Sequence, residues 1–416
     1  MTTDGATCPT AAARGLKSDL RRASRRHRTK ALLLIAPLAL FLLLTFLVPI
    51  GALLSRSVVD TEVAEILPTV SARLQSWNGT ALPEDAVFAA LATDVRAARS
   101  AGRLASAATR LNYDVNGFRS LMFSTARRLP DGPLEPSARE VLVGIDPKWG
   151  ELDTWGALAR AKGPATSLFV LGALDLRSSP GGGVEAMPPD QAVFVPILWR
   201  TLSIAGGVTL VCLLLGYPLA YLLASLPERK ANLLMICVLL PFWVSLLVRT
   251  TAWVVLLQNE GVVNSALLQF HLIHEPLPML YTRFAVYAAM VHVLLPFVVL
   301  PLYAVMKSIP PSHMRAAGSL GATPWTAFRR VYLPQTLPGV GAGGLMVFIQ
   351  ALGYYITPAL VGGAGDQMIS YFIAFYATKT INWGMAAALS LLLLMATTVL
   401  YTAYARLVGV DRMKAA

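Results

Sequence analysis

The chain has 416 residues, of which 55% are hydrophobic and only 14% are charged. Length and composition together exclude an ordinary water-soluble protein and indicate an integral membrane protein. Three cysteines are spread along the chain and none is placed to form a pair, so we expect no disulfide. The five histidines are scattered as well, and the sequence predicts no metal site.

The first 30 residues form a basic tail that precedes an apolar stretch at 31–54. Positive charge beside an apolar span is typical of a cytoplasmic membrane flank, and we favour that interpretation over nucleic-acid binding. The apolar stretch is too long for a signal peptide and has no convincing small-residue cleavage site. We therefore expect a retained membrane helix with a cytoplasmic N-terminus. The basic residues of the tail are Arg14, Lys17, Arg21, Arg22, Arg25, Arg26, Arg28 and Lys30.

Residues 55–196 have a water-soluble composition and a length that suits a small domain. Apolar residues at helical spacing predict one helix that starts at Pro83-Glu84-Asp85 and runs to about Ser100, a second from about Ala101 that carries Leu104 and Leu111, and a third around 118–122. We therefore expect a mostly helical inserted domain.

The rest of this inserted domain is less regular in sequence. Prolines between Pro130 and Pro136 break the helical pattern, and Ser178–Gly183 is interpreted as a turn-rich linker. Trp149 and Trp155 are expected to help fill the core of the domain. No catalytic constellation is found in it.

Five further apolar stretches are each long enough to cross about 30 Å of hydrocarbon. They lie at 198–225, 232–257, 284–306, 339–361 and 384–407. Together with the first stretch they predict six spans, which place both termini on one side of the membrane. Proline predicts a break in the second span at Gly216-Tyr217-Pro218, and Pro296 interrupts the fourth.

The loops and ends on one side of these spans carry an excess of Lys and Arg, whereas those on the other side carry a slight excess of acid. Positively charged loops stay in the cytoplasm, so both termini, including the end at 408–416, are expected there. Residues 55–196 are then periplasmic or extracellular. The predicted fold class is an all-α polytopic membrane protein of six transmembrane helices, with a mostly helical periplasmic insertion after the first.

A polar, basic segment at 307–338 separates the fourth and fifth spans and has its own helix signals. Pro311 can open a short helix, and Gly321 can end it in the left-handed conformation. Its positive charges are Lys307, Arg315, Arg329 and Arg330, and it contains no acidic residue.

A second short helix is expected after the glycine turn. Thr323 can cap it, with Pro324 as the first helical residue, and Pro334 and Pro338 are expected to stop it. Three aromatic residues at i, i+3 and i+7 share one face of this helix. They are Trp325, Phe328 and Tyr332.

Two interpretations of this helix pair are open on physical grounds. It is either a surface loop that keeps positive charge in the cytoplasm, or a docking element that enters a groove of another protein.

The segment resembles the EAA loop of ABC-importer permeases, in which a Glu-Ala-Ala triplet precedes a glycine and then a Leu-Pro pair. The resemblance implies that it is the coupling helix, which enters the cleft of the nucleotide-binding subunit. Arg315 stands at the glutamate position and departs from the pattern, which removes the salt bridge that a glutamate would make. The residues that the resemblance assigns to ATPase coupling are Arg315, Ala316, Ala317, Gly321, Phe328, Leu333 and Pro334.

Five more stretches extend the resemblance to permeases of the spermidine/putrescine type, over roughly 197–407. They read RTLSIAGGVTL, GYPLAYLLA, LLPFWVSLLVRTTAW, LPFVVLPLYAVMKSIPP and VFIQALGYYITPALVGG. The resemblance implies a five-helix core of the type I ABC importer after the first span, in a bacterial inner membrane. It also implies three partners: an ABC ATPase dimer, a second permease subunit and a periplasmic solute-binding protein.

The sequence has no G-x-x-x-x-G-K-[ST] phosphate loop, so we expect no enzyme activity and no cofactor in this chain. ATP and Mg²⁺ are expected to bind the partner ATPase.

Candidate residues of a substrate pathway lie in the third and fifth spans and just beyond. They are Arg249, Trp253, Glu260, Tyr354 and Tyr355. An arginine within an apolar run is costly, so Arg249 either faces protein or water or extends to the membrane interface. The Gly/Pro-rich exit of the fifth span, which holds both tyrosines, either lines a pathway or ends a helix in an aromatic belt.

The resemblance implies a polyamine substrate, but the predicted spans contain no Asp or Glu to meet a polycation. Aromatic faces offer cation–π contact instead, and another small amine, an opine-like solute or an organic acid stays open. A secondary transporter would be expected to show ionisable residues or an inverted repeat in its spans. A membrane sensor would need a cytoplasmic signalling domain, for which the nine residues after 407 leave no room.

Overall fold

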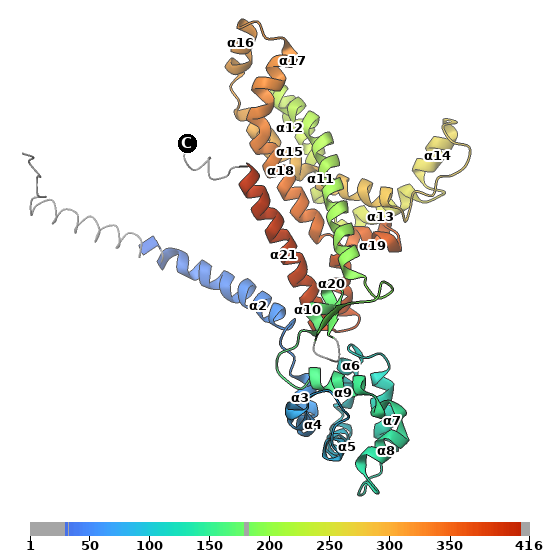
Figure 1. The fold of residues 1–416 in the computed structure, drawn as a ribbon. Helices are drawn as coiled ribbons and strands as arrows, with labels where there is room; N and C mark the ends of the chain where they lie inside the picture. The colour runs from blue at the N-terminus through green and yellow to red at the C-terminus, as the bar shows by residue number, and fades with distance from the viewer. Residues whose placement is uncertain (1–29, 32, 179–182, 409–416) are drawn as a thin grey trace, which may run out of the picture. The chain divides into compact units, whose positions relative to one another are not determined.

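The computed structural model describes residues 30–408, except 32 and 179–182 (Figure 1). The basic tail up to residue 29, Cys8 and the C-terminal segment 409–416 therefore lie outside the described residues. Within the described part, five helices are long and apolar enough to cross a membrane, or six if one sharply bent pair counts as a span. The predicted all-α polytopic architecture is thus confirmed.

The chain divides into two compact units, Met1–Ser55 and Arg56–Ala416. The first unit contains one apolar helix, Leu33–Ser55, which includes a π-helical turn η1 (Leu43–Leu47) and then α2 (Val48–Ser55). No residue of η1 or α2 is buried by other protein. An apolar helix with no protein cover suits a lipid environment.

The second unit opens with the inserted domain, in which short helices surround a single apolar core. Trp149 and Trp155 are fully buried in this core, as the sequence predicted. The Trp149 indole donates a hydrogen bond to the Thr125 hydroxyl (2.8 Å), and the Trp155 indole donates to the Trp149 carbonyl (2.9 Å). Three of the helices, α5, α6 and α7, match those predicted. The elements of the domain are α3 (Glu62–Ile66), α4 (Pro68–Arg73), η2 (Leu74–Ser76), α5 (Asp85–Ser100), α6 (Leu104–Asn112), α7 (Phe118–Arg128), α8 (Ala138–Ile145), η3 (Pro147–Gly150), α9 (Leu152–Arg160) and α10 (Leu168–Ala173).

Two short strands flank the linker that the sequence predicted at Ser178–Gly183. β1 (Leu176–Ser178) pairs antiparallel with β2 (Val184–Ala186), and Leu176 lies opposite Ala186. Residues 179–182 of the linker lie outside the described residues. Strands of three residues are too short for an alternating pattern to be recognised, so the sequence did not predict them.

The end of the inserted domain is joined tightly to the membrane helices. The Asp175 carboxylate accepts hydrogen bonds from the backbone N–H groups of Val193, Phe194 and Val195, at 3.0, 2.9 and 2.7 Å. It therefore caps α11 (Phe194–Ser225), because the first N–H groups of a helix have no partner within the helix. Phe169 of α10 packs in the same apolar cluster as Phe194.

The remaining elements form the permease-like core of the second unit. α11, α15 and α18 pack against one another around its largest apolar cluster. The elements after α11 are α12 (Glu228–Trp243), α13 (Leu246–Leu257), α14 (Val262–Gln269), α15 (Arg283–Ser308), α16 (Pro311–Ser319), α17 (Pro324–Ala327), η4 (Phe328–Tyr332), α18 (Leu333–Gly353), α19 (Ile356–Val361), η5 (Ala364–Asp366), α20 (Ile369–Thr378) and α21 (Trp383–Val408).

Glycine allows these three helices to approach closely. A Cβ atom on Gly343 of α18 would lie 3.1 Å from the Val298 Cα of α15, and one on Gly216 of α11 would lie 2.8 Å from Val298 Cγ1. Small residues at such contacts give membrane helices the van der Waals packing that holds them together.

The prolines do not break the helices as the sequence suggested. α11 continues through Pro218 and α15 continues through Pro296, because neighbouring helices hold both in place. Pro334 and Pro338 do not stop the helix after the glycine turn either, since one span runs over Pro324–Gly353. Pro334 falls in the first turn of α18, directly after the π-turn η4, where a missing N–H is tolerated.

Two predicted spans are interrupted. The predicted third span, 232–257, consists of two helices, α12 and α13, a break that the sequence did not indicate. α12 meets the segment Leu246–Gln269, which contains α13 and α14, at 98°. The predicted fifth span, 339–361, has its first helix end at Gly353, where its Gly/Pro-rich exit begins, and the short helix α19 follows. The apolar helix α20 lies in the segment predicted as a loop.

Candidate functional site

The segment between α15 and α18 folds as the predicted helix–turn–helix. α16 begins at Pro311, and Gly321 follows it with φ +85°, a conformation that glycine adopts without steric cost. The Thr323 hydroxyl then accepts a hydrogen bond from the Thr326 N–H (3.3 Å) and caps α17. The predicted turn and cap are confirmed.

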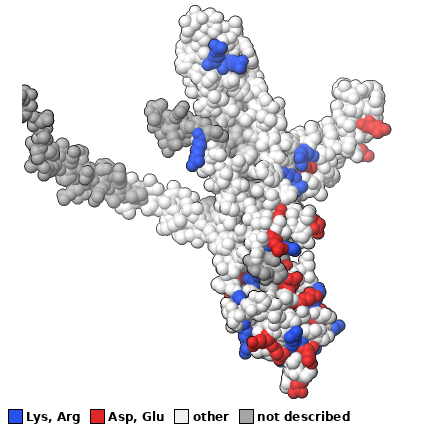
Figure 2. Space-filling model, viewed as in Figure 1, with Lys and Arg blue, Asp and Glu red and all other residues white. Residues whose placement is uncertain are grey.

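This helix pair, here called the coupling element (residues 311–327), presents apolar and basic side chains at one end of the bundle. Leu320 is 89% exposed and Trp325 is 69% exposed. Arg315 and Ala316 are exposed beside them. Figure 2 shows basic and no acidic side chains on the visible face of this end. Exposed apolar residues surrounded by polar ones are typical of a protein-docking surface.

Aromatic rings connect the coupling element to the spans. The Trp325 ring stacks on Phe328, with centroids 5.8 Å apart, and Phe328 stacks on Tyr332 at 5.9 Å. Phe328 also meets Tyr217 and Tyr221 of α11 edge-on, at 6.3 and 6.1 Å. A continuous row of ring contacts thus links the coupling element to α11.

The other predicted coupling residues lie at the base of the element. Ala317 is buried, Leu333 is half-buried and Pro334 is exposed. His313 Nδ1 and Gln335 Oε1 are 2.8 Å apart and tie α16 to α18. The sequence did not indicate this last pair, because residues 22 apart share no local pattern.

Arg249 lies at the break in the third span. It is only 8% exposed, and its Nη2 atom donates hydrogen bonds to the carbonyl groups of Pro241 and Val244, the latter at 2.7 Å. Pro241 lies in the last turn of α12 and Val244 directly follows it. The Pro241 carbonyl also accepts a long hydrogen bond from the Val244 N–H (3.4 Å), so the guanidinium strengthens the C-terminal end of α12. Arg249 therefore faces protein rather than extending to the membrane interface.

Trp253 lies one turn further along α13 and pairs with a histidine that the sequence analysis did not single out. The Trp253 indole N–H donates to His292 Nδ1 of α15 (3.2 Å), and the ring centroids are 5.8 Å apart. Because an indole can only donate, His292 Nδ1 carries a lone pair and its proton is on Nε2. His292 is exposed in the isolated chain although it lies within a membrane helix, so it faces a partner subunit or a water-filled path.

A cavity of about 290 Å³ opens beside this pair, between α11, α12 and α15. Its lining is mostly aliphatic. It includes Leu219, Cys237, Pro241, His292 and Pro296. Two of the lining residues are prolines, and Leu219 directly follows Pro218. The cavity therefore lies beside positions where a helix lacks one backbone N–H donor.

The structure does not join all five predicted pathway residues into one site. Tyr354 is half-buried, and its carbonyl accepts a hydrogen bond from the Ser370 hydroxyl (2.8 Å). Tyr355 is exposed, and Glu260 is exposed between α13 and α14 without an ion pair to any described residue. Arg249 and Trp253 lie one turn apart on α13, whereas Glu260 lies beyond the end of that helix.

A helical bundle in the membrane, with an exposed helix pair joined rigidly to its spans and a broken span beside a cavity, defines a transport subunit. Residues 216–409 match the family described as "Binding-protein-dependent transport system inner membrane component". The chain belongs to this family, and it is the permease subunit of an ABC importer.

The curated relatives support the same assignment. The spermidine/putrescine transport system permease protein PotB of Haemophilus influenzae is 35% identical over 206 residues, which cover 49% of this chain and 72% of the relative. PotB of Escherichia coli K12 is 34% identical, over 51% of this chain and 78% of its own length. The inner membrane ABC transporter permease protein YdcU of E. coli K12 is 34% identical, over 53% and 74%.

Among solved structures, a bacterial ABC transporter involved in the import of the acidic polysaccharide alginate superposes with a TM-score of 0.44. It is 20% identical and covers 52% of this chain and 79% of its own.

Proposed function

We propose that this chain is one half of the translocation path of an ATP-driven importer, with the coupling element docked in an ATPase subunit. The observation that carries the proposal is the exposed apolar rim of the coupling element together with its ring contacts to α11. A second permease subunit completes the path, and a solute-binding protein delivers the substrate.

The coupling element lies in the cytoplasm under this proposal, and so do both termini. The support is the charge pattern, since the segment 307–338 holds four basic residues and no acidic one. The inserted domain and the connection between α19 and α20 then lie on the opposite, periplasmic side.

Energy is supplied by a partner under this proposal. The sequence contains no phosphate loop, so ATP and Mg²⁺ bind the partner ATPase dimer. Closure of that dimer moves the coupling element, and the bundle alternates between two packings whose populations ATP shifts.

The proposed substrate is a polyamine such as spermidine or putrescine. The printed names of the PotB relatives support this class. Apart from Glu228 and Glu260 at helix ends, the described membrane helices contain no acidic residue. We therefore assign the recognition of positive charge to the partner subunit and the binding protein, and the contact with aliphatic and aromatic groups to the Trp253 region of this chain.

Uptake of labelled putrescine and spermidine at low external concentration tests the substrate. Cells that lack only this chain are compared with cells in which it is restored. Uptake that is lost and then restored supports the polyamine class, whereas unchanged uptake rejects it.

Co-purification tests the assembly independently of substrate. A tagged chain is expected to retain its ATPase subunit and second permease subunit in mild detergent. Recovery of the chain alone, under conditions in which it stays folded, would contradict the proposed complex.

A further inference from the structure

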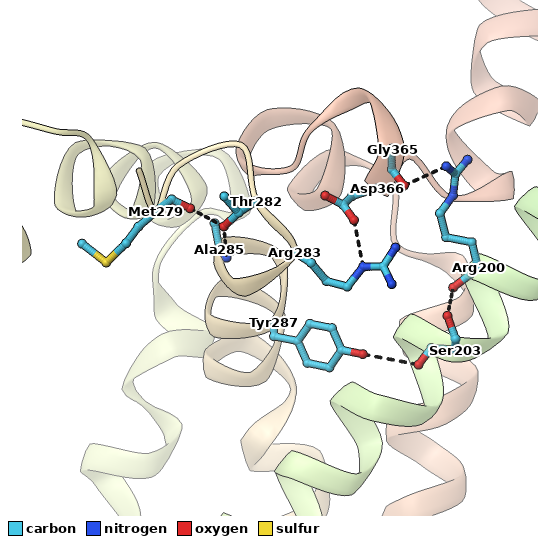
Figure 3. A network of polar contacts seen from close by, with 9 residues as sticks. All are labelled: Arg200, Ser203, Met279, Thr282, Arg283, Ala285, Tyr287, Gly365 and Asp366. Atoms are coloured by element: carbon cyan, nitrogen blue, oxygen red, sulfur yellow. Dashed lines mark hydrogen bonds and ion pairs between the residues drawn. The ribbon is translucent and has the colours of Figure 1, made fainter. Parts of the chain in front are cut away.

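The connection between α19 and α20, residues 362–368, is held at the end of the bundle opposite α16, here called the distal end. Four contacts hold it, and they come from two different membrane helices and the loop before one of them. Figure 3 shows the two that involve arginine side chains. None of these residues belongs to the coupling element or to the Trp253 region.

Backbone contacts fix the two ends of the connection. The Tyr281 N–H donates to the Val361 carbonyl (2.9 Å), just before α15 begins. The Ile369 N–H donates to the hydroxyl of Thr201 (2.9 Å), a fully buried residue of α11.

Two arginines hold the middle of the connection. Arg283 Nε, at the start of α15, donates to Asp366 Oδ1 (2.9 Å). Arg200 Nη1 of α11 donates to the Gly365 carbonyl (2.7 Å). Figure 3 shows both guanidinium groups directed at the same short loop from opposite sides.

Asp366 is the one acidic side chain among these contacts. It is 8% exposed, whereas the Arg283 side chain is 53% exposed. The Arg200 guanidinium also interacts electrostatically with Asp366, but the direct hydrogen-bonded ion pair is with Arg283. Because the carboxylate is buried, this pair matters more than a fully exposed one.

A direct contact also ties α11 to α15 at the distal end. The Tyr287 hydroxyl of α15 donates to the Ser203 carbonyl of α11 (3.4 Å). Within α11, the Ser203 hydroxyl donates to the Arg200 carbonyl (2.8 Å). Hydrogen bonds and an ion pair can be exchanged for water when two helix ends separate. The apolar, glycine-packed middle of the bundle cannot open in this way without losing its van der Waals contacts.

We propose that Asp366 is a positioning residue for transport: it holds the distal ends of α11 and α15 together in the resting state, and the contact with Arg283 breaks when that side opens. This inference rests on the proposed function, since it needs an alternation that ATP and a binding protein drive.

The test uses the complete reconstituted complex with Asp366→Asn. The variant keeps the size of the side chain and removes its charge. Loss of one charge-assisted hydrogen bond shifts a two-state equilibrium by about tenfold toward the open distal end. ATPase activity without binding protein is therefore expected to rise by about that factor, and the stimulation by binding protein to fall.

A double variant exchanges the two residues, Arg283→Asp with Asp366→Arg, and is called the exchanged pair. It is expected to lower the ATPase activity without binding protein again. If Asp366→Asn acted only by damaging the fold, this exchange would not reverse its effect. Arg283→Gln provides a second disruption that leaves the loop sequence intact. The matched control is Glu185→Gln. Glu185 and Arg177 form an exposed ion pair (3.7 Å) between β1 and β2, and its loss is not expected to change the ATPase activity.

A distance measurement supplies the conformational readout. Spin labels at Trp199 and Phe284, which are 70% and 59% exposed beside the two arginines, report the separation of α11 and α15. They are placed in a chain whose native cysteines are replaced. Asp366→Asn is expected to lengthen this distance in the resting complex, and the exchanged pair to shorten it again.

The outcomes separate the two hypotheses. If the unmodified complex shows no ATPase activity that depends on binding protein, the proposed function is wrong. If the unmodified complex is coupled, but Asp366→Asn changes neither the distance nor the basal activity, the role of Asp366 is overturned.

Discussion

The Arg249 guanidinium donates a hydrogen bond to the Pro241 carbonyl across the break between α12 and α13. A cation at the carbonyl end of a helix is favourable, because the unsatisfied carbonyls give that end a partial negative charge. Within a membrane these carbonyls have no water to bind, so the arginine stabilises the bent conformation of the third span.

Arg249→Leu is expected to destabilise the permease. The Val244 carbonyl loses its donor, at a cost of about 1–3 kcal/mol, and the Pro241 carbonyl keeps only its long bond from the Val244 N–H. The measurement is the melting temperature of the purified complex in detergent. Arg249→Lys keeps a charged donor, and its melting temperature is expected to lie between those of the native protein and Arg249→Leu. Equal melting temperatures of all three forms would contradict the stabilising role.

Gly321→Val is expected to weaken binding of the ATPase while membrane insertion stays normal. A β-branched residue in the left-handed conformation costs at least about 1–2 kcal/mol, so the turn between α16 and α17 is distorted. Co-purification of the ATPase measures the effect.

Two neighbouring variants serve as controls for the glycine turn. Asn tolerates the left-handed conformation, so Gly321→Asn is expected to bind the ATPase nearly normally. Gly318→Ala lies in α16 with open space around its Cβ position and is expected to have no effect. ATPase binding that is lost equally in all three variants would show that the backbone conformation is not the cause.

Phe328→Ala is expected to uncouple hydrolysis from transport. The substitution removes the ring that contacts Tyr217 and Tyr221, whereas the exposed rim of the coupling element stays in place. The complex should therefore still assemble and hydrolyse ATP, while uptake per ATP falls. The control is Phe242→Ala, which removes another ring pair, Phe242 with Phe297 at 5.0 Å, away from the coupling element.

Asp175→Ala is expected to loosen the joint between the inserted domain and α11. Loss of a capping side chain costs about 1 kcal/mol on average, with a range of about 0.5–2 kcal/mol. Asp175→Asn retains one acceptor oxygen, so it is expected to lose less of the capping free energy than Asp175→Ala. Hydrogen exchange of the amides of Val193, Phe194 and Val195 measures the change directly, and unchanged protection in Asp175→Ala would show that the cap is dispensable.

The start, the turn and the cap of the coupling element could be predicted from the sequence because these signals are local, whereas the end of its second helix could not. Pro311, Gly321 and Thr323 act through the backbone conformation of their own turn, and that conformation is the same in any environment. The membrane class and the buried role of Trp149 and Trp155 could be predicted for a similar reason, since hydrophobicity needs no knowledge of neighbours.

The breaks in the helices could be decided only by tertiary structure. Proline removes one hydrogen bond, and whether a helix bends there depends on what packs beside it. α11 and α15 therefore run on through Pro218 and Pro296, whereas α12 meets the segment Leu246–Gln269 at 98°. The contacts of Arg249 with Pro241, Trp253 with His292 and Arg283 with Asp366 join side chains that are 8, 39 and 83 residues apart. Sequence patterns report which residues lie on one face of an element, whereas the partner of a polar side chain is set by the folded arrangement of several elements.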